Sequence, residues 1–267
     1  MSTLYRPTFL SLLALVSGLT LANSAFGQQT ADYFVTLAAS EALKGDWDAA
    51  IADFSKAIEI DPKSVDAYEH RGIAKLQKGD LDGAIADSRR TIELNPNVVE
   101  AYFIIGKAEM AKGDLDNAIG NFNRAIDLYP QFAEAYVHLA LARYKRKNWD
   151  GAIEADSKAI EIRPKYAVAY EWRCAAKIMK GDLDGAIVDS STAIELEPNN
   201  PATYVHRGFA KEKKNDLDGA IADLTKAIEL NPTLVTAYKH RGEAKKAKGD
   251  QAGADEDFAQ VTKLQGH

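Results

Sequence analysis

A repeat of 34 residues constrains this chain more than any other feature of its sequence. The stretch 79–96, GDLDGAIADSRRTIELNP, has near-copies along the chain. Six prolines and seven alanines recur at intervals of 34 residues. The prolines are Pro62, Pro96, Pro130, Pro164, Pro198 and Pro232, and the alanines are Ala50, Ala84, Ala118, Ala152, Ala186, Ala220 and Ala254. A repeated unit buries its apolar face on its neighbours, so such a chain needs no single compact core.

Each copy of the repeat predicts two helices. In the copy 65–98, residues 65–79 have helical spacing, and Gly79 is typical of a helix C-terminus. Asp80 suits the N-cap of a second helix, which continues to Pro96. The unit is therefore predicted to be an antiparallel helical hairpin. Seven such units are expected, at 31–64, 65–98, 99–132, 133–166, 167–200, 201–234 and 235–267.

Three positions of the unit are nearly invariant in kind. Position 4 is aromatic and position 8 is small, while position 20 is the periodic alanine named above. The residues at positions 4 and 8 are Phe34, Tyr68, Tyr102, Tyr136, Tyr170, Tyr204 and Tyr238, and Ala38, Gly72, Gly106, Ala140, Cys174, Gly208 and Gly242. With this pattern, residues 31–267 resemble the tetratricopeptide repeat (TPR) family. The resemblance implies an all-α fold, a right-handed TPR solenoid built as a superhelix of antiparallel helical hairpins.

The chain departs from the family pattern at two positions. Position 11, usually tyrosine in the family, carries a charge in every unit. Position 24, often aromatic in the family, is Asp156 in the fourth unit. Both departures put local packing in question without affecting the expected fold.

Residues 1–27 do not share the repeat and have the order of a secretory signal peptide. Arg6 precedes an apolar run from Phe9 to Ala22, and small residues follow up to Gly27. We expect cleavage after Gly27, with cleavage after Ala25 as the second choice and an uncleaved anchor as an alternative. Residues 28–30 would then be a short N-terminal segment. This predicts a periplasmic or secreted protein with no stable membrane insertion after signal removal.

Composition excludes several classes of function. The formal net charge is −6 and no basic run is present, which argues against nucleic acid as a partner. The single cysteine, Cys174, cannot form an internal disulfide, and we interpret it as a small core residue. No nucleophile, metalloprotease or phosphate-loop motif occurs, so we expect no catalysis, no catalytic residues and no cofactor.

Four of the five histidines share unit position 6, and Trp172 holds that position in the fifth unit. The row is His70, His138, Trp172, His206 and His240. Equivalent side chains on stacked hairpins lie about 8–10 Å apart, too far to share one metal ion. We therefore predict no metal site in the row and interpret it as a polar flank, with pH sensing or ligand contact as alternatives.

The repeats predict structural ion pairs between the two helices of a unit. Wherever position 7 is arginine, position 23 is aspartate. The predicted pairs are Arg71 with Asp87, Arg173 with Asp189, Arg207 with Asp223, and Arg241 with Asp257.

The resemblance implies that positions 2, 5, 9, 12 and 13 of each first helix line a concave, peptide-binding face. The apolar candidates are Ile73, Leu76, Phe103, Met110, Val137, Leu141, Tyr144, Ile178, Met179, Val205 and Phe209. Acidic candidates among them are Glu69, Glu100, Glu134 and Glu171. These residues predict a non-catalytic scaffold, exported from the cytoplasm, that binds a protein or peptide. The alternatives are a structural or self-assembling envelope protein, or an accessory subunit of an envelope enzyme complex.

Overall fold

The computed structural model describes residues 30–266, which fall into two compact units divided after Pro130. The predicted signal peptide lies outside the described residues. In the N-terminal unit the helices are α2 (Ala31–Lys44), α3 (Trp47–Ile60), α4 (Val65–Lys78), α5 (Leu81–Leu94), α6 (Val99–Lys112) and α7 (Leu115–Leu128). In the C-terminal unit they are α8 (Ala133–Lys145), α9 (Trp149–Ile162), α10 (Ala167–Lys180), α11 (Leu183–Leu196), α12 (Pro201–Lys213), α13 (Leu217–Leu230), α14 (Val235–Ala247) and α15 (Gln251–Gln265).

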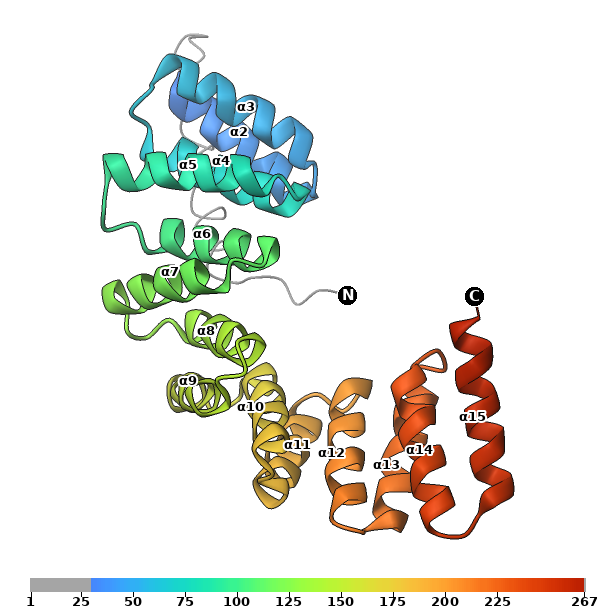
Figure 1. Ribbon diagram of the computed structural model, residues 1–267. Helices are drawn as coiled ribbons and strands as arrows, with labels where there is room; N and C mark the ends of the chain where they lie inside the picture. The colour runs from blue at the N-terminus through green and yellow to red at the C-terminus, as the bar shows by residue number, and fades with distance from the viewer. Residues whose placement is uncertain (1–29, 267) are drawn as a thin grey trace. The chain divides into compact units, whose positions relative to one another are not determined.

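The predicted all-α array of hairpins is confirmed (Figure 1). Residues 30–266 contain no strand, and every even-numbered helix is followed after a short turn by its odd-numbered partner. Below, the even-numbered helices are called first helices and the odd-numbered ones second helices. Within each compact unit, a second helix packs both on its own first helix and on the first helix of the next pair. In this part of the chain no helix combines the length and apolar character needed to span a bilayer.

Turn chemistry sets where the helices end and begin. Gly79 closes α4 in the left-handed region, with φ of 82°, where a residue without a Cβ meets no steric cost. Asp80 then caps α5 by accepting a hydrogen bond of 2.9 Å from the Gly83 N–H. Equivalent caps open all seven second helices and are Asp46, Asp80, Asp114, Asn148, Asp182, Asp216 and Asp250.

Two of these turns lack the glycine. Lys147 and Asn215 take the left-handed conformation instead, with φ of 60° and 64°. Asparagine tolerates this region because its short amide can bond locally, whereas lysine gains no such compensation. The turn at Lys147 is therefore a strained point of the repeat.

Small residues let the two helices of a pair approach closely. A Cβ added at Gly106 would lie 2.7 Å from the Phe122 ring, closer than atoms can pack. Every periodic alanine at position 20 is buried between helices. Cys174 occupies a small position of the same kind, has no exposed surface, and packs in a cluster with Ala186 and Ala210. The structure thus places this cysteine in the core, as predicted.

Candidate functional site

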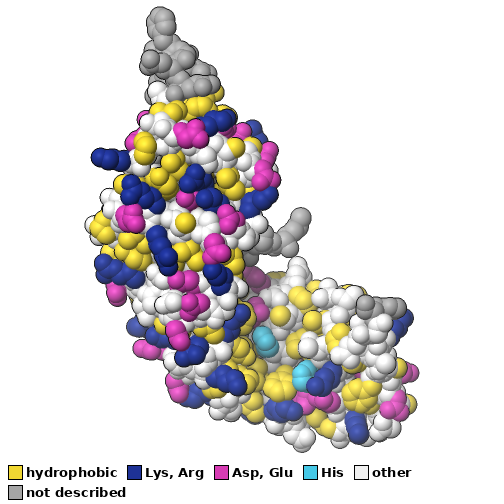
Figure 2. Space-filling view, turned by 45° about the horizontal axis from the view of Figure 1, so that its top comes forward, with side chains coloured by type: hydrophobic (Ala, Val, Ile, Leu, Met, Phe, Trp, Pro, Cys, Tyr) yellow, Lys and Arg dark blue, Asp and Glu magenta, His cyan; other side chains and the backbone are white. Residues whose placement is uncertain are grey.

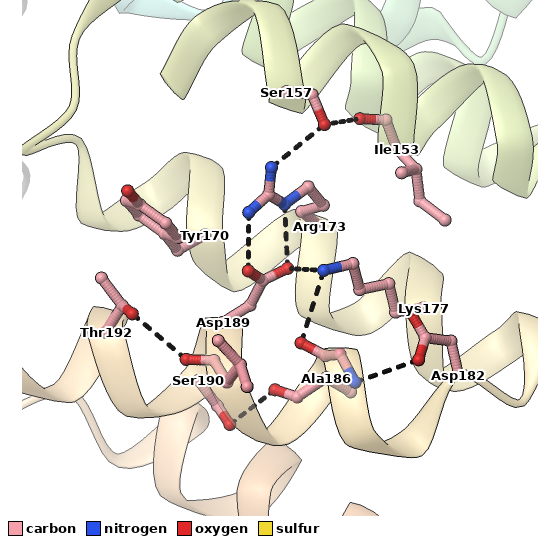
Figure 3. A network of polar contacts seen from close by, with 12 residues as sticks. Ile153, Ser157, Tyr170, Arg173, Lys177, Asp182, Ala186, Asp189, Ser190 and Thr192 are labelled. Atoms are coloured by element: carbon pink, nitrogen blue, oxygen red, sulfur yellow. Dashed lines mark hydrogen bonds and ion pairs between the residues drawn. The ribbon is translucent and has the colours of Figure 1, made fainter. Parts of the chain in front are cut away.

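A buried polar network joins the helices in four of the pairs, and Figure 3 shows one copy. Arg173 on α10 donates to both carboxylate oxygens of Asp189 on α11, at 2.9 and 2.7 Å. Its remaining Nη1 donates to the Ser157 Oγ of the preceding α9 at 3.0 Å. Lys177 adds an ion pair of 2.8 Å to the same aspartate, whose side chain is 2% exposed.

The other three predicted pairs have the same geometry. Arginine–aspartate distances are 2.7, 2.7 and 2.6 Å for Arg71 with Asp87, Arg207 with Asp223, and Arg241 with Asp257. In each copy the charged residue of position 11 is a lysine that pairs with the same aspartate, and these lysines are Lys75, Lys211 and Lys245. In these four units the departure from the family pattern at position 11 is thus part of this network.

A pocket of about 330 Å³ lies on the first helices of the C-terminal unit. It brings together five of the predicted groove residues, which are Tyr144, Ile178, Met179, Val205 and Phe209. The rest of its lining is Ala175, Ala202, His206, Leu234, Thr236 and His240. In Figure 2, hydrophobic and histidine side chains gather together on the hollowed face of the C-terminal part of the molecule.

Side-chain size explains why the hollow forms here. Position 9 is Ala175 in α10, while neighbouring units place Leu141 and Phe209 at that position. Ala202, at position 2 of α12, leaves further space next to it. Phe209 and Tyr144 provide the aromatic walls, and Met179 is 52% exposed at the opening. The pocket therefore combines a shallow alanine floor with apolar walls that a partner can reach.

In the N-terminal unit the predicted groove residues form only a small recess. Ile73, Leu76, Glu100 and Phe103 line a cavity of about 20 Å³, room for about one water molecule. Phe103 is 1% exposed and packs on Phe122, with the ring centroids 5.6 Å apart. Phe103 is consequently a core residue and offers almost no surface to a partner.

The remaining predicted residues lie apart from the pocket. Val137 is buried in a core cluster, and Glu134 is buried against Arg163 at 2.9 Å. Glu171 accepts a hydrogen bond of 2.7 Å from Asn200. Burial, with the nearby Asp66, raises the pKa of Glu69 to about 7. Met110 and Leu141 are half-buried and line neither cavity.

The histidines at position 6 have different surroundings. His70 is buried and stacks on Phe54, whereas His206 and His240 line the pocket. Burial lowers the pKa of both His70 and His206. His240 instead faces two carboxylates, Glu212 and Glu243, which the sequence did not single out because they occupy different unit positions.

Comparison with known families identifies the repeat. The family profile described as "Tetratricopeptide repeat" matches residues 69–131, 105–167 and 201–234, and the profile described as "TPR repeat" matches 40–78. Together these matches span more than half of the 267 residues. No curated protein matches the chain at a significant level.

Solved structures agree with the profiles. MamA is 32% identical over 60% of this chain and 94% of its own, with a TM-score of 0.57. A TPR protein from Parabacteroides merdae is 18% identical over 89% of this chain and 94% of its own, with a TM-score of 0.68. YrrB, described as a TPR protein with an unusual peptide-binding site, is 21% identical over 69% and 95%, with a TM-score of 0.59. From its repeat pattern, its hairpin array and these matches, the chain belongs to the tetratricopeptide repeat family.

Proposed function

We propose that this TPR protein is a non-catalytic scaffold, exported from the cytoplasm, that binds a peptide segment of a partner through the first-helix pocket of its C-terminal unit. The TPR fold supports a protein-interaction scaffold. The observation that carries the proposal is the pocket of about 330 Å³ walled by Tyr144, Ile178 and Phe209. Pockets that hold small ligands or anchoring side chains start at about 300 Å³.

The chemistry of the lining indicates what the pocket takes. Its walls are apolar and aromatic, so the anchor would be an apolar or aromatic side chain of an extended peptide. Met179 and Phe209 would contact that anchor, and Ala175 would form the floor beneath it. YrrB, a protein of the same fold described as having an unusual peptide-binding site, supports peptide binding as a use of this architecture.

The test is selection of peptides from a random library displayed on phage, with the full-length chain as target. Affinities of selected peptides are then measured by fluorescence anisotropy for wild type, Met179→Asp, Phe209→Ala and Val188→Asp. Val188, on the second helix α11, is 64% exposed and serves as the matched control. The pocket variants should lose at least about tenfold in affinity, the loss of one good apolar contact.

Equal binding by all four proteins would contradict the pocket as the binding site. Unchanged helicity by circular dichroism separates a lost contact from a lost fold. Light scattering on the same proteins measures their oligomeric state and so tests self-assembly. If wild type forms an oligomer that Met179→Asp converts to a monomer, a second copy of the chain fills the pocket instead of a peptide.

Export rests on the sequence of residues 1–27 and is tested separately. The exported protein should begin near Gln28 when its N-terminus is sequenced. Recovery of Met1 or Ser2 at that position on the native protein would contradict export with cleavage.

A further inference from the structure

Three ligand-type side chains converge beside the pocket, on α12 and α14. His240 Nδ1 lies 3.3 Å from Glu212 Oε2 and 3.2 Å from Glu243 Oε2. The three atoms all lie within 4.8 Å of one another. His240 and Glu243 are three residues apart on one helix, a spacing that places both side chains on the same face and recurs in metal-binding helical proteins.

Hydrogen bonds from the described part of the protein leave this cluster incompletely satisfied. Nδ1 of His240 carries at most one proton, and its geometry directs that hydrogen bond to Glu243. The Glu212 side chain is 10% exposed, and its Oε2 atom is fully buried. This oxygen has no hydrogen-bond partner among residues 30–266. Two carboxylates that face the same imidazole nitrogen, one of them through a buried oxygen, would be stabilised by a cation bound between them.

Two of the three separations in the cluster are close to those between the ligand atoms of a transition metal. In a tetrahedral site with bonds of about 2.0–2.2 Å, neighbouring ligand atoms lie about 3.3–3.6 Å apart. The two separations at His240 are 3.3 and 3.2 Å. Glu243, whose side chain is 39% exposed, has the freedom to close the third edge.

Nearby groups are compatible with a bound cation. Lys213 pairs with the other oxygen of the Glu212 carboxylate, Oε1, at 3.0 Å, so Oε2 stays available. The Phe209 ring lies 4.8 Å from the His240 ring and shields one side of the imidazole. One imidazole with two carboxylates suits zinc and similar divalent transition metals better than magnesium or calcium, which prefer all-oxygen sites.

We propose that Glu212, His240 and Glu243 bind one divalent transition metal ion of the zinc class, with Glu212 Oε2, His240 Nδ1 and Glu243 Oε2 as ligands. The His240 tautomer would then carry its proton on Nε2. Three protein ligands leave a coordination position open. This inference stands on the cluster alone and is independent of peptide binding.

The experiment is isothermal titration of the full-length chain with Zn²⁺, repeated with Mg²⁺ and followed by Co²⁺ absorption spectra. The variants are Glu243→Gln, Glu212→Gln and His240→Asn. Two matched controls are Glu229→Gln, at an exposed glutamate of α13 that pairs with Lys226 of the same helix, and His206→Gln, at the other pocket histidine.

We expect one Zn²⁺ per chain, no comparable Mg²⁺ binding, and a Co²⁺ spectrum that requires His240. Changes in outer-shell partners of metal sites typically weaken affinity about 10–100-fold, so loss of a ligand itself should cost at least about tenfold. The two controls should bind as wild type. Absence of saturable Zn²⁺ binding, or binding unchanged in Glu243→Gln and His240→Asn, would overturn the proposal. Because Glu243 is partly exposed, its variant tests the site without depending on a core side chain.

Discussion

Arg173 holds Asp189 with two parallel hydrogen bonds of 2.9 and 2.7 Å, across the two helices of one repeat. The aspartate side chain is 2% exposed, so the pair is shielded from water on the acidic side. Planar two-point contacts of this kind are among the strongest charge-assisted hydrogen bonds. The geometry makes this pair the natural place to measure what the polar network contributes.

Removing Asp189 should destabilise the chain much more than removing an exposed partner. Asp189→Asn leaves Arg173 and Lys177 without their carboxylate, and we expect a loss of about 3–5 kcal/mol in the free energy of unfolding. Urea denaturation followed by circular dichroism measures this. Asp150→Asn, which breaks the exposed ion pair with Lys180, should cost at most about 1 kcal/mol.

A double-mutant cycle then tests the pairing itself. Arg173→Leu should cost less in the Asp189→Asn background than in wild type, with a coupling energy of about 0.5–3 kcal/mol. Purely additive losses would mean that the two residues do not interact in solution.

Asp156 is a buried carboxyl group in the fourth repeat, and its removal should stabilise the fold. Its side chain has no exposed surface, and neither carboxylate oxygen accepts a hydrogen bond from the described residues. Desolvation raises the pKa of this carboxyl well above its usual range, although Arg173 opposes the shift. Asp156→Leu should gain about 1–3 kcal/mol at neutral pH.

The pH dependence of that gain follows from the direction of the shift. A raised pKa means that the folded chain keeps a proton that the unfolded chain releases above about pH 4. Wild type therefore loses stability as the pH rises from there through the folded pKa. The stability difference between Asp156→Leu and wild type should increase with pH and be smallest at about pH 4, where the carboxyl is protonated in both the folded and the unfolded chain. A gap that does not change with pH, in both this variant and the smaller Asp156→Ser, would contradict the assignment.

Lys147→Gly should stabilise the turn between α8 and α9. A non-glycine residue in the left-handed region destabilises the folded chain by about 1–2 kcal/mol. Glycine relieves this strain, but it raises the entropy of the unfolded chain, which costs about 0.5–1 kcal/mol. The expected net gain is about 0.5–1 kcal/mol, read from the denaturation midpoint. Asn215→Gly is the matched control and should gain less, since asparagine accepts this conformation. An equal gain at both positions would count against strain at Lys147.

Cys174 should resist alkylation until the repeat opens. Burial raises the pKa of its thiol to about 12, so almost no thiolate exists at about pH 8. We expect reaction with iodoacetamide at least about a hundredfold slower in the native chain than in denaturant, since the thiolate is the reactive form. Val188→Cys in a Cys174→Ala background should react promptly and is the exposed reference. Similar native rates for the two cysteines would contradict a closed core around α10.

The hairpins and the arginine–aspartate pairs could be predicted because equivalent positions can be compared among the seven repeats of the chain. Arginine at position 7 and aspartate at position 23 occur together, and contact follows from that correlation. The lysine at position 11 occurs in the same four units as the arginine and the aspartate, and Lys177 pairs with Asp189. The same correlation therefore predicts this lysine as a second partner of the aspartate.

The groove could be predicted only in part. Among the apolar residues at position 5, Phe103 and Val137 are core residues, whereas Val205 lines the pocket. A hollow depends on local side-chain volume, and Ala175 creates it by being smaller than its counterparts Leu141 and Phe209. Contacts between different unit positions of neighbouring repeats, such as His240 with Glu212, depend on how the helices pack. The repeat period alone does not predict them.

The polar contacts of the repeat have a consequence for how this protein can change in length. Arg71 reaches Asp87 and Ser55 at sequence offsets of 16, and Lys78 reaches Asp48 at an offset of 30. Every one of these offsets is shorter than the repeat. The lysine–aspartate contacts at the offset of 30 recur from unit to unit, so duplicating one internal unit brings such a lysine back beside an aspartate. Growth by whole repeats would preserve these contacts between neighbouring units, whereas an insertion that shifts the period inside a unit would separate the lysine from its aspartate.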